Sequence, residues 1–201
     1  MKKLLLIFIT LTMSAMVIAQ EKSKQKEVGL VFSSLDNFGL TYKTGSEKSL
    51  WRFNTLFISG SSFKETADSL DYEQSNKGFG LKFGKEYRKV IIEKFEFRYG
   101  ADISFSYNQS KNIVDDKSIS DRDRTIEQTI YSPGINLVIG FNYVFKEHLV
   151  VGAELLPNFS YSTGKSKETG YTYNNDVERN ISGFSYGLSN TSALLSLSYR
   201  F

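Results

Sequence analysis

A strictly alternating stretch in the middle of the chain constrains the fold more than any other feature. From Phe95 to Tyr107 every second residue is aromatic or aliphatic, whereas the residues between them include Glu96, Arg98 and Asp102. Successive side chains of a β-strand point to opposite faces. The stretch therefore predicts one long strand with an apolar face and a polar face, and no helical spacing fits it.

The same alternation recurs along the chain and predicts eight antiparallel strands. We expect them at 27–35, 37–45, 48–60, 75–88, 94–108, 125–145, 148–161 and 179–201. Two of them change phase, at Ser132-Pro133-Gly134 and at 189–192, where we expect a β-bulge, which flips the parity. A true turn at 189–192, giving nine strands, is the alternative. The even strand number of single-chain bacterial barrels favours the bulge.

The connections between these strands alternate in length. The links near 45–48, 89–93 and 146–148 are tight, and long polar segments occupy 61–74, 109–124 and 162–178. Only the first hairpin, at 35–37, is short where a long loop is expected. Short periplasmic turns and long external loops are typical of outer-membrane barrels, whose tilted strands need about 9–11 residues to cross the bilayer. The sequence thus predicts an all-β fold, an eight-stranded up-and-down transmembrane β-barrel.

The apolar face of these strands is expected to contact lipid. An eight-stranded interior is just filled by side chains, and the 16 Phe and 12 Tyr of the chain would overpack it. Aromatic residues also gather at both ends of the strands, as two membrane interfaces require. The belt on the tight-turn side would contain Trp51, Tyr87, Phe95, Phe145, Tyr199 and Phe201, and the other Tyr107, Tyr161 and Tyr186.

The opposite face carries charges of both signs, which would then point into the barrel. Because an unpaired buried charge costs several kcal/mol, we expect them to neutralise one another as a structural ion-pair network that plugs the lumen. A narrow channel for small solutes is the alternative. The expected members are Lys43, Arg52, Lys82, Glu86, Glu96, Arg98, Asp102, Glu154 and Arg200.

The N-terminus has the layout of a secretory signal peptide. Basic Lys2-Lys3 precedes an apolar run, and small residues precede Gln20, so we expect cleavage after Ala19. Residues 20–26 would be a short periplasmic segment and 27–201 the barrel, with both termini periplasmic. Removal of the two lysines lowers the net charge from +3 to +1, which gives no case for a nucleic-acid partner.

The chain offers little for catalysis, and we expect no enzyme, catalytic residue, metal or cofactor. Its single histidine, His148, lies in a tight turn without a positioned partner. Glu96, Arg98 and Asp102 share the interior face and resemble an acid/base set. An ion-pair plug explains them better, because side chains fill an interior of this size. The chain also contains no cysteine, hence no disulfide and no lipid-attachment cysteine.

The last strand ends on Ser196-Leu197-Ser198-Tyr199-Arg200-Phe201, with Leu197, Tyr199 and Phe201 on one face. With this ending, the chain resembles the small outer-membrane β-barrel domain proteins of Bacteroidetes, with a PorT-like or OmpX-like architecture. The resemblance rests on pattern over 27–201 and implies a fold and an outer-membrane location. It implies that the barrel assembly machinery reads the C-terminal strand. Some relatives assist protein secretion or act as adhesins. We expect a monomer in outer-membrane lipid whose loops contact an extracellular protein or glycan.

Overall fold

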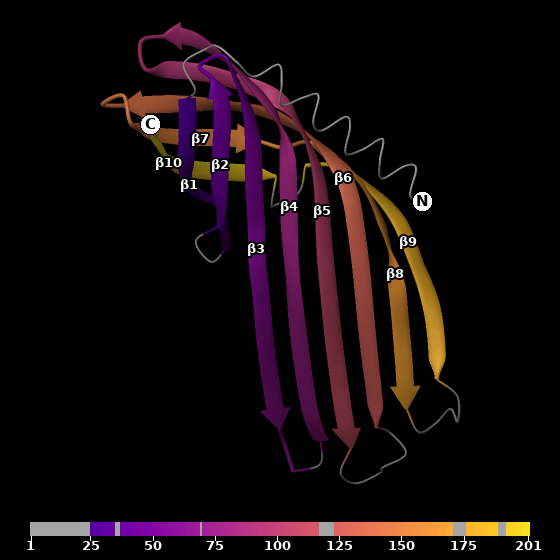
Figure 1. The fold of residues 1–201 in the computed structure, drawn as a ribbon. Helices are drawn as coiled ribbons and strands as arrows, with labels where there is room; N and C mark the ends of the chain where they lie inside the picture. The colour runs from indigo at the N-terminus through magenta and orange to yellow at the C-terminus, as the bar shows by residue number, and fades with distance from the viewer. Residues whose placement is uncertain (1–24, 35–36, 69, 117–122, 171–175, 189–191) are drawn as a thin grey trace, which may run out of the picture.

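The computed structural model describes residues 25–34, 37–68, 70–116, 123–170, 176–188 and 192–201 (Figure 1). The predicted signal peptide, 1–19, and its cleavage site lie outside the described residues. Within these ranges no helix is long and apolar enough to cross a membrane. The strands are β1 (Gln25–Ser34), β2 (Asn37–Ser46), β3 (Ser49–Thr66), β4 (Leu70–Ile92), β5 (Phe95–Asp116), β6 (Arg124–Phe145), β7 (Leu149–Leu155), β8 (Asn158–Gly170), β9 (Val177–Gly187) and β10 (Ala193–Arg200).

Eight of these strands close into an antiparallel ring in the order β1-β2-β3-β4-β5-β6-β7-β10. The ring is completed where the last strand pairs with the first, with Leu30 opposite Leu197. The predicted eight-stranded up-and-down barrel is confirmed. Closure leaves no free strand edge within the ring, which is the condition for a sheet to exist in a lipid environment.

Strands β7 and β8 are two halves of the seventh barrel strand. Strand β6 pairs with both in one unbroken register, with Ile139 opposite Leu155 and Asn136 opposite Asn158. The interruption falls at Pro157, which has no N–H to donate. Its carbonyl still accepts a hydrogen bond of 2.8 Å from the Leu137 N–H, so β6 continues alongside without a gap.

Strands β9 and β10 are likewise two parts of the eighth strand. Gly187 lies opposite Asn158 and Ala193 opposite Leu155, so six residues of the eighth strand span three of the seventh. Both parts run antiparallel to their neighbour, so the chain keeps its direction and the nine-stranded alternative is wrong. The insertion is larger than a one-residue β-bulge and still flips the parity. Residues 189–191 themselves lie outside the described residues.

The bulge expected at Ser132-Pro133-Gly134 is absent. Strands β5 and β6 pair without a register shift from Phe95 opposite Tyr143 to Val114 opposite Arg124. Ile126 and Ile130 therefore point to the inner face of the sheet, opposite to Ile135. The change of phase in the sequence marks the level at which the apolar face changes side. It does not mark an inserted residue.

Beyond the closed ring, β3, β4, β5, β6, β8 and β9 continue as a six-stranded projecting sheet (Figure 1). The segments expected as long loops, 61–74, 109–124 and 162–178, are mostly strand: Thr66 pairs with Asp71 and Leu70 with Asp116. The loop prediction was wrong because polar and charged residues lie on both faces of this sheet, as the neighbours Lys111 and Asn112 on β5 illustrate. Paired backbone groups maintain the strands there without the alternation that marks a strand in sequence.

The projecting sheet has two free edges. The outer part of β3, from Ser59 to Thr66, pairs only with β4, and β9 pairs only with β8. Strand β9 is exposed on both faces, with Phe184 70% and Tyr186 83% exposed. The β1–β2 hairpin is too short to reach the projecting sheet, so it covers neither of these edges.

Candidate functional site: the charged interior of the barrel

The layer of the interior nearest the tight turns joins the first, fourth, fifth and last strands of the ring. Arg88 on β4 donates hydrogen bonds from Nη1 and Nη2 to Glu27 Oε1 and Oε2, at 2.6 and 2.7 Å. Arg200 on β10 donates from Nε to Glu27 Oε1 at 2.7 Å. Its Nη1 and Nη2 reach the two oxygens of Glu96 on β5, each at 2.9 Å. Such two-point contacts fix the orientation of both partners.

Glu86 is the centre of the next layer and has no exposed surface. Its Oε2 accepts hydrogen bonds from Lys43 Nζ at 2.9 Å and from Arg52 Nη1 at 3.1 Å. Its Oε1 accepts from Arg88 Nε at 2.7 Å, and Arg98 Nη1 lies 3.6 Å from Oε2. Four cations from four strands, β2 to β5, thus surround one carboxylate.

Glu154 on β7 holds the layer above. Arg52 donates from Nη1 to Glu154 Oε2 at 2.9 Å and from Nη2 to Glu154 Oε1 at 2.8 Å. Arg98 Nη2 lies 3.2 Å from Glu154 Oε2, and Arg52 Nε lies 3.3 Å from Asp102 Oδ1. The side chains of Arg52, Arg98, Glu154 and Asp102 are at most 2% exposed.

The structure brings eight of the nine predicted interior residues into direct ion pairs. Lys82 is buried on the same face, but it makes no ion pair with any residue that the structure describes. Its ammonium group lies at the end of the charged layers that is farther from the tight turns.

Two members of the network were missed in the sequence. Glu27 is fully buried between Arg88 and Arg200, and Arg88 is 7% exposed. Both lie at the ends of the expected strands, where alternation is least informative. The alternation was the available signal. Arg88 follows Glu86 by two positions and so shares its face, and Glu27 precedes apolar Val28 and so points to the opposite, polar face. The described interior thus holds six cations and five anions: Lys43, Arg52, Lys82, Arg88, Arg98 and Arg200 with Glu27, Glu86, Glu96, Asp102 and Glu154.

Glycines on the inner face make room for these long side chains. A Cβ at Gly152 would lie 2.5 Å from Ser196 Oγ and 2.9 Å from Arg98 Nη2. A Cβ at Gly140 would lie 3.0 Å from Arg98 Nε. The Arg98 guanidinium therefore occupies space that any larger residue at either position would fill.

An apolar cluster closes one side of the interior above Glu154. Val138, Leu156 and Leu194 are 1–2% exposed and contact one another. Their strands β6, β10 and the β7–β8 junction lie side by side in the ring. At this level the described part of the interior contains packed apolar and ion-paired side chains.

The acid/base set considered in the sequence, Glu96, Arg98 and Asp102, is divided between layers of the interior. Among the residues that the structure describes, no three His, Cys, Asp or Glu side chains are grouped so that they could hold a metal ion. Glu96 is held by Arg200, and Arg98 and Asp102 lie in the deeper layers. His148 lies in the tight turn after β6, where its Nδ1 is 3.0 Å from the Arg200 carbonyl oxygen and its ring stacks on Tyr199.

The outer face of the ring carries the aromatic residues. On the tight-turn side Trp51 stacks on Phe83 and Tyr87 stacks on Tyr99, with ring centroids 5.3 and 5.6 Å apart. Phe95, Phe145 and Phe201 also lie at this level, as predicted. At the other level the described rings of Tyr107, Tyr161 and Tyr186 lie on the same outer face, beside Phe79, Tyr131 and Phe184.

The predicted assembly residues Leu197, Tyr199 and Phe201 all point outward from β10 and are 45–57% exposed. The Phe201 N–H donates to the Lys26 carbonyl, and its own carbonyl accepts from the Lys26 N–H, both at 2.9 Å. The last residue is thus paired to the first strand. Recognition of this strand by the assembly machinery stays a prediction.

The projecting sheet carries exposed ion pairs around β8. Arg124 and Arg179 contact the two carboxylate oxygens of Glu168, at 2.7 and 3.2 Å. Lys165 pairs with Glu178, and Lys167 Nζ lies 2.7 Å from Asp176 Oδ2. This hydrogen bond raises the pKa of Lys167 above its ordinary value.

No protein-family model and no curated protein matches the chain. The structure is similar to a major outer membrane protein from Thermus thermophilus, at 11% identity and a TM-score of 0.50, over 90% of this chain and 100% of that one. The chain has the fold of an outer-membrane β-barrel. Weaker similarities are to Ail of Yersinia pestis (13% identity, TM-score 0.39, 90% of this chain and 100% of that one) and CarO of Acinetobacter baumannii (8%, 0.35, 88% and 96%).

Proposed function

We propose that this protein is a non-enzymatic barrel of a bacterial outer membrane, whose interior is sealed by ion pairs and whose projecting sheet contacts partners outside the cell. The observation that carries the proposal is the three-layered network around Glu27, Glu86 and Glu154. Its arginines cross the interior from strand to strand, so their side chains occupy the space that a solute path would need.

The outer face supports the location. Its residues between the two aromatic levels are apolar and exposed, among them Ile103 at 64%, Leu137 at 54% and Leu195 at 62%. Exposed apolar residues around a complete ring need a hydrocarbon environment, which a bilayer supplies. The resemblance to PorT-like barrels of Bacteroidetes, which the sequence suggested, agrees with this location and stays part of the proposal.

Conductance across a planar bilayer tests the sealed interior. The wild-type barrel is expected to give no steady single-channel steps. An Arg98→Ser/Glu154→Ser variant removes one cation and one anion together and is expected to give such steps. Reproducible steps from the wild type would instead support the narrow channel. Heat-modifiable gel mobility shows whether each variant has folded.

Cysteine labelling tests the orientation, because the natural chain has no cysteine. A membrane-impermeant maleimide on intact cells should label Ser166→Cys in the projecting sheet and leave Glu147→Cys in a tight turn unlabelled. Labelling of Glu147→Cys alone would place the projecting sheet, and not the turns and the C-terminus, on the periplasmic side.

Partner contact is proposed for the free edge of β9. Unpaired backbone groups along an edge strand can accept a further strand, and Ile181–Gly187 carries no charge or proline to prevent it. A photoreactive residue at Ser182 on intact cells should give a discrete protein adduct, and one at Ser106 inside the sheet should not. Ser185→Lys should abolish the adduct by charging the edge. An adduct that persists in this variant would place the contact elsewhere.

A further inference from the structure

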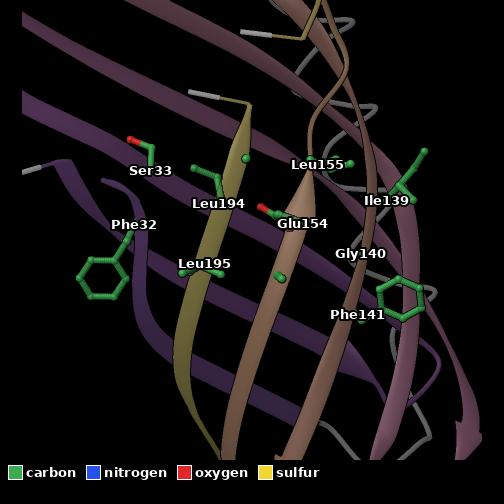
Figure 2. Close-up of a pocket in the computed structure, with 11 residues that line it drawn as sticks. Phe32, Ser33, Ile139, Gly140, Phe141, Glu154, Leu155, Leu194 and Leu195 are labelled. Carbon is green, nitrogen blue, oxygen red and sulfur yellow. The ribbon is translucent and has the colours of Figure 1, made fainter. Parts of the chain in front are cut away.

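An apolar groove lies on the outer face of the ring. It has a volume of about 710 Å³ and lies across β1, β10, β7 and β6 (Figure 2). The Phe32 ring borders one side and the Phe141 ring the other, with β10 and β7 between them (Figure 2).

The groove exists because two small residues replace bulky ones at its floor. Ala153 on β7 and Ala193 on β10 point outward from adjacent strands, and Ala153 lies opposite Leu195. Most other outward positions at this level carry large side chains, such as Ile139, which is 45% exposed beside the groove.

The lining is almost wholly apolar, and its two polar residues do not present a polar group to the groove. The hydroxyl oxygen of Ser33 is buried, and the carboxylate of Glu154 points into the barrel, where Arg52 binds both of its oxygens. The groove therefore fits an aliphatic chain, and it lies within the outward apolar band that the proposed function places in lipid.

The depth of the groove along the strands determines which leaflet of the membrane it contacts. Ala153 lies four residues after Leu149, where β7 leaves the tight turn, and eight residues before Tyr161 at the far aromatic level. The groove is therefore nearer the periplasmic surface, whose leaflet in a Gram-negative outer membrane consists of phospholipid.

We propose that this groove holds one acyl chain of a phospholipid from the periplasmic leaflet. The proposal rests on the proposed membrane location. A second copy of the chain is the competing occupant, and it would bring Ala153 of two barrels close together.

Native mass spectrometry after reconstitution with phosphatidylethanolamine tests the proposal. The wild-type barrel is expected to retain one phospholipid on release from detergent. Ala153→Phe and Ala193→Phe fill the floor and should lower its retention by at least about tenfold, the effect of roughly 1.4 kcal/mol. Ala101→Phe is the matched control, because Ala101 is exposed on β5 outside the groove, and it should retain lipid like the wild type.

Equal lipid retention by all four proteins, or none by the wild type, would overturn the proposal. So would retention of lipopolysaccharide without phospholipid in a parallel reconstitution. An Ala153→Cys variant that forms disulfide-linked dimers in vesicles would assign the groove to a second copy. Ala153→Leu adds a smaller side chain to the floor of the groove, and it replaces the phenylalanine variants if either fails the heat-modifiability test. Failure of the proposed location has a different sign, because the maleimide would then fail to label Ser166→Cys on intact cells.

Discussion

Arg52 and Glu154 bind each other through two hydrogen bonds of 2.8 and 2.9 Å across the inside of the barrel, although 102 residues separate them in the chain. Arg52 also contacts Glu86 and Asp102, so this one side chain joins two layers of the interior. The pair connects β3 to β7, strands on different sides of the ring, and so braces the barrel against collapse.

Removing the charge of Glu154 should destabilise the barrel strongly. Glu154→Gln leaves the guanidinium groups of Arg52 and Arg98 buried with fewer anions, and breaking a buried pair in this way costs about 3–5 kcal/mol. The free energy of unfolding by urea in lipid vesicles measures the effect. Glu178→Gln, at an exposed pair with Lys165, is the control and should change stability by less than about 1 kcal/mol. Similar losses in both variants would contradict the bracing role.

The space left by glycine beside Arg98 should not tolerate a larger residue. Gly152→Val would place atoms against Ser196 Oγ and Arg98 Nη2, and overpacking of this kind costs about 1–3 kcal/mol. At Gly183 on β9 no atom lies within 4 Å of an added Cβ, so Gly183→Ala should be within about 0.5 kcal/mol of the wild type. The same urea titration compares the two, and an unchanged Gly152→Val variant would show that the interior can expand.

Backbone amides of the free edge should exchange with solvent faster than those of the ring. Strand β9 has one neighbour, whereas β5 is paired on both sides along most of its length, and local opening is easiest where fewest contacts must break. Hydrogen exchange followed by NMR in detergent micelles measures the difference. Equal protection of both strands would indicate that a partner or a second chain covers the edge of β9.

The terminal aromatic residue should matter for assembly more than for stability. Phe201→Ala is expected to lower the amount of folded protein in the outer membrane, because the last strand is the segment that we expect the assembly machinery to read. Phe145→Ala removes a comparably exposed ring at the same level, 47% against 57%, and should leave the yield near that of the wild type. Quantification of the heat-modifiable form in membrane fractions decides between them, and equal yields would contradict a special role of Phe201.

The alternation from Phe95 to Tyr107 was sufficient to predict both the barrel and the direction of its charges. Inside a bilayer every outward residue must be apolar, so the strand period is written directly into the sequence. Eight of the nine predicted interior residues consequently pair with one another, and only Lys82 does not.

Outside the part of each strand that faces the bilayer, the sequence loses its two-residue period, and the prediction of long loops there was wrong. In the projecting sheet water meets both faces, so the segments around Asp71 and Lys111 read as loops although they are paired strands. The phase change before Ile135 was misread as a bulge for a different reason, because the apolar residues there move to the other face of the strand without an inserted residue.

The sequence by itself determined that this chain forms a closed barrel with an apolar exterior and a charged interior, because a local two-residue period encodes both faces of each strand. Only the tertiary structure decided how the charges pair, where the sheet opens and where the wall is hollowed. Those features depend on the register between distant strands, such as Ala193 beside Leu155, and register is a property of the closed ring that no single segment carries.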